Sequence, residues 1–183
     1  MNRLEIFPTI FYETNIDPRL AFDILEDIKS KKTRIDLVHE STQITPVSDY
    51  STDFIEPIDV PLFDQHVVPQ LINEFKEMDV SLEIGNKWVS CYTGPDGCHP
   101  MHIHAKRFSG VPEFSAILYL TSIGYTDFFN TTLHSDQYQH SIESQVGKIV
   151  FFPSIIPHQY RAERFDGNHR YTLPFNVILH GLK

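Results

Sequence analysis

The segment His99-Pro100-Met101-His102-Ile103-His104 places three imidazoles close together in the chain. Side chains at positions i and i+2 of a β-strand point to the same face, so His102 and His104 could bind one metal ion together. His99 would face the other way in a regular strand, but it remains a possible substitute ligand. A protein metal site usually needs a third side chain. The segment therefore predicts either a metal site completed elsewhere in the chain or a polar edge strand without such a role.

The best candidate for the third ligand lies far downstream. His158 follows Pro157 at the start of a new β-like run, where a neighbouring strand could bring it beside His102 and His104. We therefore predict a metal held by these three imidazoles, with coordination positions left for another molecule.

Arg170 begins a run whose residues alternate in polarity, as in a strand with one polar and one apolar face. An arginine that faces a barrel interior needs an anion, because an unpaired buried charge is costly. A carboxylate suits a guanidinium because it can accept two parallel hydrogen bonds. We expect Thr172 to donate a further one. The polar face comprises Arg170, Thr172, Pro174 and Asn176, and the apolar face comprises Tyr171, Leu173, Phe175 and Val177.

The spacing of short β-like runs after Val80 predicts a β-sandwich or barrel. We expect one domain, 1–183, in which residues 1–79 supply a strand and helices that pack on a core formed by 80–183. The N-terminal elements expected are a strand over Leu4–Tyr12, a helix that begins at Asp17-Pro18, irregular chain with a short strand over Lys31–Asp59, and a helix over Pro61–Met78 that Pro69 kinks or restarts. The core strands expected are Val80–Ile84, Trp88–Tyr92, Met101–His104, Phe114–Thr121, Tyr125–Asn130, Gly147–Phe152, His158–Ala162 and Tyr171–His180.

Composition excludes several classes of protein. The formal charge of −9 argues against a generic binder of nucleic acid or anionic membrane, since such partners need clustered Lys and Arg. Two cysteines, Cys91 and Cys98, are too few for a disulfide framework. The first residues contain no long apolar run, and no segment approaches the roughly 20 apolar residues of a membrane span. We expect a cytoplasmic protein.

The order of these motifs resembles that of the Fe(II)- and 2-oxoglutarate-dependent dioxygenases, in particular the prolyl-hydroxylase-like branch. That family has His-x-Asp/Glu, a distal His, and then an Arg that holds the far carboxylate of 2-oxoglutarate. The matching positions are His102, His104, His158 and Arg170. Further similarity lies in Cys91–Gly94, Ser115–Thr121 and Gly147–Pro153, and the opening Ile6–Thr9 is similar to small bacterial and phage members.

The resemblance implies a mostly β fold, a double-stranded β-helix of the jelly-roll or cupin type. It also implies Fe(II) on His102, His104 and His158, with 2-oxoglutarate and O2 as co-substrates. Arg170 and Thr172 would then hold the co-substrate, with Tyr92 and Tyr119 lining its pocket. The expected reaction is hydroxylation of a carbon in a peptidyl, amino-acid or other small substrate, with release of succinate and CO2.

One position departs from the family pattern, because His104 stands where a carboxylate is usual. Either His104 is the third ligand, or an acid such as Asp127 completes the site, or the position is open as in halogenating relatives. The rival hypothesis is a cupin-like, non-redox metal-binding or structural module, since three histidines and a water also form a zinc site. We expect substrate choice to depend on Lys31–Asp59, Lys106–Glu113 and Thr131–Gln145.

Overall fold

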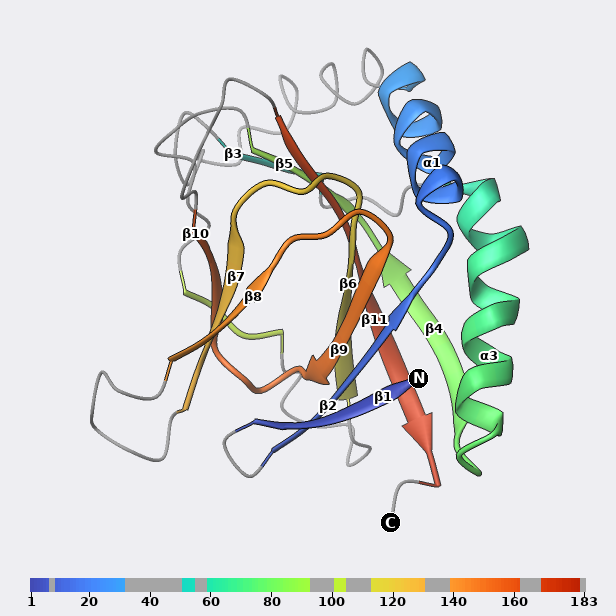
Figure 1. The fold of residues 1–183 in the computed structure, drawn as a ribbon, viewed down its shortest axis with the longest axis vertical. Helices are drawn as coiled ribbons and strands as arrows, with labels where there is room; N and C mark the ends of the chain where they lie inside the picture. Colours follow the sequence, from blue (N-terminus) through green and yellow to red (C-terminus); the bar gives the residue numbers. More distant parts are fainter. Residues whose placement is uncertain are drawn as a thin grey trace.

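Within the described residues, helices, a large β-sheet and a small β-sheet form three layers (Figure 1). The computed structural model describes residues 1–6, 9–31, 51–54, 59–92, 101–104, 113–130, 139–161 and 169–181. The prediction of a mostly β protein with N-terminal helices packed on the sheet is confirmed. None of the helices in these ranges is long and apolar enough to cross a membrane.

All strand pairs in both sheets are antiparallel. The large sheet has the order β1-β2-β9-β6-β11-β5-β3, with β4 also paired to β11, and the small sheet has the order β10-β7-β8. The large sheet contains β1 (Asn2–Ile6), β2 (Thr9–Asn15), β3 (Ser51–Phe54), β4 (Ser81–Lys87), β5 (Val89–Tyr92), β6 (Glu113–Tyr119), β9 (Lys148–Pro153) and β11 (Arg170–His180); the small sheet contains β7 (Tyr125–Phe129), β8 (Gln139–Glu143) and β10 (His158–Arg161).

The first helix, α1 (Pro18–Ser30), begins where the sequence predicted. The Asp17 carboxylate accepts a hydrogen bond from the backbone N–H of Arg19, at 2.8 Å, and Pro18 occupies the first turn, where no N–H is needed. The buried face consists of Ala21, Ile24, Leu25 and Ile28. Phe22 is 57% exposed because it lies away from this buried face of the helix.

The second predicted helix is interrupted near Pro69, as expected. Phe63–Val67 form a π-helical turn, η1, in which the N–H of Val68 bonds to the carbonyl of Phe63. The α-helix α3 (Val68–Lys76) then begins with Pro69 in its first turn. A proline inside a regular helix would remove one hydrogen bond and clash with the preceding turn, and the wider turn before it avoids this conflict.

Three expectations about strands were wrong. The N-terminal strand is an antiparallel pair, β1 and β2, with Leu4 opposite Phe11. Strand β8 lies inside Thr131–Gln145, a range in which we predicted no strand. In Met101–His104 only His102 pairs as a strand residue, through one isolated bridge to His158. The Lys31–Asp59 region contains the short strand β3, and most of its other residues lie outside the described ranges.

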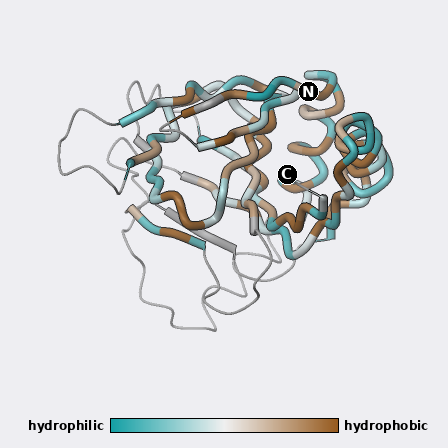
Figure 2. The backbone as a smooth tube through the Cα atoms, turned by 90° about the horizontal axis from the view of Figure 1, so that it is seen from below, coloured by the Kyte–Doolittle hydropathy of each residue, from teal (hydrophilic) through white to brown (hydrophobic). Residues whose placement is uncertain are grey.

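Two apolar clusters hold the layers together. The first lies between the helices and the large sheet, and the second lies between the two sheets and includes Phe11, Phe128 and Phe152. In Figure 2 the hydrophobic colour runs through the central strands, whereas the helices alternate between hydrophobic and hydrophilic residues. The helices therefore cover one face of the large sheet and leave its other face to the interior between the sheets.

Strand β11 shows the two faces predicted for it. Tyr171, Leu173, Phe175 and Val177 belong to the cluster under the helices. Arg170, Thr172, Pro174 and Asn176 line a cavity between the sheets. The alternation read from the sequence thus separates the packed side of the strand from the side that faces the cavity.

Candidate metal centre and its cavity

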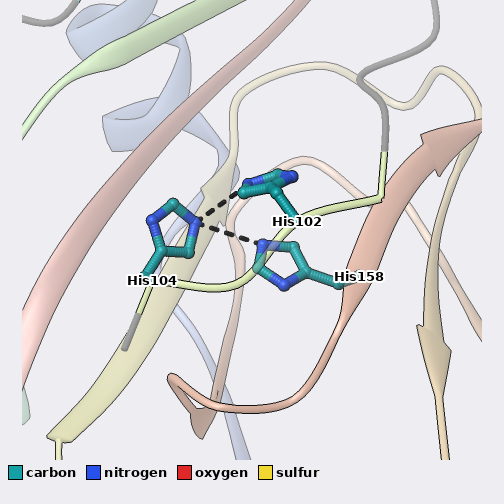
Figure 3. A group of neighbouring side chains, drawn as sticks. All are labelled: His102, His104 and His158. Carbon is teal, nitrogen blue, oxygen red and sulfur yellow. Dashed lines mark hydrogen bonds between the residues drawn. The ribbon is translucent and has the colours of Figure 1, made fainter. Parts of the chain in front are cut away.

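Backbone hydrogen bonds bring two distant segments together at the three histidines, whose side chains are drawn in Figure 3. The N–H of His102 donates to the carbonyl of His158 at 3.0 Å, and the N–H of His158 donates back at 3.1 Å. The N–H of His104 donates to the carbonyl of Ser154 at 2.9 Å. The 101–104 segment therefore runs along the free edge of β10, which places His102 and His104 beside His158.

The ring nitrogens have spacings that suit a shared metal ion. The Nε2 atom of His104 lies 3.1 Å from that of His102 and 3.2 Å from that of His158, and the three candidate ligand atoms all lie within 4.8 Å of one another. Ligands about 2.0–2.1 Å from one metal lie about 2.8–3.4 Å apart when the angle between them is between a right angle and the tetrahedral angle. The two short contacts fall within that interval.

The tautomer of His158 also fits a metal ligand. Its Nδ1 lies 3.0 Å from the carbonyl oxygen of Ile156, and since a carbonyl only accepts, Nδ1 carries the proton. The Nε2 atom then presents its lone pair toward His104. A neutral His104 has a single N–H and cannot donate to both neighbours, whereas a cation between the rings would satisfy all three nitrogens. The arrangement therefore fits a metal better than a hydrogen-bonded trio.

Aromatic side chains flank two of the three imidazoles, His158 and His104. The His158 ring, 4% exposed, lies 4.7 Å from the Phe152 ring and 6.0 Å from the Phe128 ring, measured between centroids. The Trp88 ring lies 5.3 Å from His104. These walls keep water away from one side of the ligand set and strengthen electrostatic interactions there.

The acid proposed as an alternative ligand lies elsewhere. Asp127 is fully buried on β7, and its Oδ1 accepts a hydrogen bond from Ser141 at 2.6 Å. Within the described ranges the group able to hold a metal is His102, His104 and His158, without Asp127. His99 lies outside those ranges. The candidate ligands that the structure brings together are therefore three imidazoles.

A cavity of about 430 Å³ extends from the histidines to Arg170. Arg170 is 2% exposed, and its guanidinium donates to the hydroxyls of Thr126 (3.2 Å) and Ser144 (3.4 Å). The guanidinium carbon lies 4.0 Å from the centroid of the Tyr160 ring, a cation–π contact that fixes its plane. Arg170 thus brings a buried, oriented positive charge to one end of the cavity.

Tyr160 lines the cavity, whereas Tyr119, one of the two predicted tyrosines, is not among the lining residues. Tyr119 is fully buried, 5.6 Å from the Arg170 guanidinium carbon, and donates to Thr126 at 2.9 Å from behind the cavity wall. Tyr92 pairs with Arg170 in the β5–β11 register, and its side chain lies outside what the structure describes. Burial raises the pKa values of Tyr119 and Tyr160, while the positive charge of Arg170 acts in the opposite direction. Both remain neutral phenols at physiological pH.

Hydroxyl groups continue along the wall next to Arg170. Thr172, predicted from the sequence, pairs with Ser90 across β11 and β5, and both line the cavity. Sequence reasoning missed Ser90, Thr126 and Tyr160. The spacing of Tyr160, two residues after His158, was a usable signal, because it places both side chains on one face of β10. Thr126 reaches the cavity only because β7 pairs with β10, which no local pattern reveals.

Comparison with known proteins gives similarity in structure only. No protein-family model and no curated protein sequence matches the chain. A prolyl-4-hydroxylase from Pseudomonas putida is similar with a TM-score of 0.58 and 18% identity, over 92% of this chain and 91% of the other. The non-haem monooxygenase ThoJ, solved as a nickel complex, has a TM-score of 0.67 and 12% identity, over 95% and 75%.

A third solved structure carries both a metal and the keto acid. HygX from Streptomyces hygroscopicus, solved with nickel and 2-oxoglutarate bound, has a TM-score of 0.63 and 12% identity, over 93% of this chain and 83% of its own. These similarities confirm the predicted architecture of two facing antiparallel sheets. The chain therefore has the double-stranded β-helix fold of the 2-oxoglutarate- and Fe(II)-dependent oxygenases, the prolyl hydroxylases among them.

Proposed function

We propose that the protein is a non-haem Fe(II)- and 2-oxoglutarate-dependent oxygenase. It would hydroxylate a carbon of a peptidyl, amino-acid or other small substrate and release succinate and CO2. The observation that carries this proposal is the convergence of three imidazoles on one end of a cavity whose other end holds the buried guanidinium of Arg170. The shared fold with known oxygenases of this class supports it.

His102, His104 and His158 would hold the iron, and Arg170 with Thr172 would hold the distal carboxylate of 2-oxoglutarate. When bound, iron and the keto acid together supply the oxygen chemistry, including oxidative decarboxylation to succinate. The spacing supports this division of roles. Tyr160, whose ring centroid lies 4.0 Å from the Arg170 guanidinium carbon, stands two residues after His158, about 7 Å along β10. That distance suits a short dicarboxylate between the metal ligands and the guanidinium.

The protein's own groups would bind, orient and exclude water. The Ile156 carbonyl holds the His158 ring in the tautomer that a metal requires. Tyr160 and the hydroxyls of Thr126 and Ser144 keep the guanidinium in one orientation, so a bound carboxylate would not have to order it. Phe128 and Phe152 keep solvent from the His158 side of the site. The tyrosine roles predicted from the resemblance, for Tyr92 and Tyr119, remain predictions.

Two spectroscopic and chemical measurements test the proposal. Addition of Fe(II) and 2-oxoglutarate without oxygen should produce a weak visible charge-transfer band, and exposure to air should form succinate even without the prime substrate. His158→Ala should lose both signals, since it removes the most buried ligand. A wild-type protein that gives neither signal after verified iron loading would contradict the proposal.

A non-redox metal-binding module is the second candidate, and one observation favours it. Three imidazoles without a carboxylate are the ligand set of a well-known type of zinc site. Such a protein would retain zinc tightly, show no band with Fe(II) and 2-oxoglutarate, and form no succinate. Metal analysis of the purified protein, combined with the two measurements above, separates the candidates.

A further inference from the structure

The cavity continues past the histidines on the side away from Arg170. Trp88 marks this continuation, because its ring centroid lies 5.3 Å from that of His104 and its backbone N–H donates to the carbonyl of Pro174 at 3.0 Å. Asn176 lines the cavity six residues after Arg170, about 20 Å further along the strand. We call the part of the wall formed by Asn86, Lys87, Trp88, Pro174 and Asn176 the distal arm.

A β-bulge shapes the distal arm. In the β4–β11 pair, Phe175 is opposite Lys87 while Val177 is opposite Ile84, so the single residue Asn176 faces the two residues Gly85 and Asn86. A Cβ atom at Gly85 would lie only 3.3 Å from the Cβ of Asn176, which shows how closely the strands approach. The break in alternation lets three consecutive residues, 86–88, line the cavity.

Two carboxamides in this arm have hydrogen-bonding capacity to spare. Within the part of the chain that the structure describes, the side chains of Asn86 and Asn176 make no hydrogen bond. Asn86 is exposed and Asn176 is partly buried, and each offers two donors and one carbonyl acceptor. An amide group is the natural complement, since it also presents a donor and an acceptor side by side.

The one charge in the distal arm is already compensated. Lys87 Nζ lies 2.9 Å from both carboxylate oxygens of Asp64, which projects from the π-helical turn η1. The Lys87 side chain is only 17% exposed, so it is held in this pair rather than extended into solvent. The described part of this arm is therefore close to neutral, whereas the opposite end of the cavity carries the charge of Arg170.

We propose that the distal arm binds a neutral amide group of the prime substrate, with Asn86 and Asn176 as specificity-determining residues. The inference rests on the proposed function, because it assumes that the metal and 2-oxoglutarate occupy the rest of the cavity. It goes further in predicting that the group next to the reacting carbon is an amide rather than a carboxylate or an ammonium. Because Asp64 and Lys87 pair with each other, the distal arm would offer no unpaired charge to bind a carboxylate or an ammonium group.

Paramagnetic relaxation can test whether the distal arm prefers an amide group, and the measurement needs no turnover. Protein loaded with Mn(II) and saturated with 2-oxoglutarate is mixed with N-methylacetamide, acetate or methylammonium, and the relaxation of the probe methyl protons is measured. N-methylacetamide should show the largest enhancement in the wild type. Asn86→Ala with Asn176→Ala should reduce it at least fivefold, and Asn86→Ala alone, at an exposed site, should reduce it measurably. Asn73→Ala, on the exposed side of α3, is the matched control and should have no effect.

A second variant checks the charge argument. Asp64→Asn leaves Lys87 uncompensated, so the enhancement for acetate should rise above that for N-methylacetamide. Equal enhancement for all three probes in the wild type, or no change in the double variant, would overturn the inference. Mn(II) binding is followed separately by water-proton relaxation. If Mn(II) failed to bind, the proposed function would fall, and this inference would fall with it. If Mn(II) bound but the three probes were not distinguished, only this inference would fall.

Discussion

The two faces of β11 serve different purposes although their residues alternate along one strand. Tyr171, Leu173, Phe175 and Val177 pack beneath the helices, and the residues between them line the cavity. The packed face is apolar and closed, while the cavity face carries a charge, a hydroxyl and a carboxamide. Substitutions one residue apart should therefore affect different properties, and the comparison can be tested position by position.

The largest effect is expected on the packed face. Phe175 is fully buried, with its ring 5.0 Å from that of Phe63 and 6.0 Å from that of Phe151. Phe175→Ala should lower the free energy of unfolding by about 3–5 kcal/mol, because it leaves a cavity in the core. Urea titration measures the loss. The Ni(II) affinity of the folded variant at low temperature should match that of the wild type. A decrease in the free energy of unfolding below about 1 kcal/mol would show that the two faces are not distinct.

Arg170 should give the next largest effect, on binding rather than folding. Arg170→Met removes the buried charge but keeps most of the side-chain volume, so 2-oxoglutarate affinity should fall at least about 100-fold while Ni(II) affinity is retained. Calorimetric titration of the Ni(II)-loaded protein gives both values. Arg19→Met, at an exposed position in α1, is the control. Unchanged 2-oxoglutarate affinity would contradict the role given to Arg170.

Thr172→Val tests a single hydroxyl on the cavity face. The substitution keeps the branched shape, so we expect a loss of about 1 kcal/mol in 2-oxoglutarate binding, roughly fivefold. The urea midpoint should stay within experimental error of the wild type. A drop in stability without a change in affinity would place Thr172 with the packed residues instead.

The smallest effect concerns pH. Tyr119 lies opposite Thr172 in the β6–β11 register, and burial raises the pKa of its hydroxyl. The unfolded chain would ionise this tyrosine near pH 10, before the folded chain does. The stabilising contribution is therefore complete below about pH 10 and is lost as the pH rises through the folded pKa. Tyr119→Phe, which cannot ionise, should lose less stability between pH 9 and pH 11 in urea titrations, and an identical loss would contradict the prediction.

Local patterns were enough to predict part of this structure. The i, i+2 spacing of His102 and His104, the Asp17-Pro18 helix start and the alternation in β11 all depend on near neighbours in sequence, and the structure has each of them. The interruption near Pro69 follows from the proline ring itself.

What the sequence did not predict depends on contacts between distant segments. The β1–β2 pair was missed because Leu4–Tyr12 is β-like in composition apart from Pro8, and a single proline is also compatible with one edge strand. Thr126 and Tyr160 reach Arg170 through the pairing of β7 with β10, and the bulge opposite Asn176 depends on how β4 is aligned with β11. None of these alignments leaves a periodic signal in either strand alone.

The reciprocal hydrogen bonds between His102 and His158 couple two events that are usually separate, opening of the sheet edge and loss of the proposed metal-ligand geometry. Any fluctuation that frees the edge of the small sheet at this bridge also disperses the proposed metal ligands. Amide hydrogens of His102 and His158 should then exchange with solvent at a common rate, which would slow on metal addition and quicken with a chelator. Hydrogen exchange at these two amides would report how often the metal site opens.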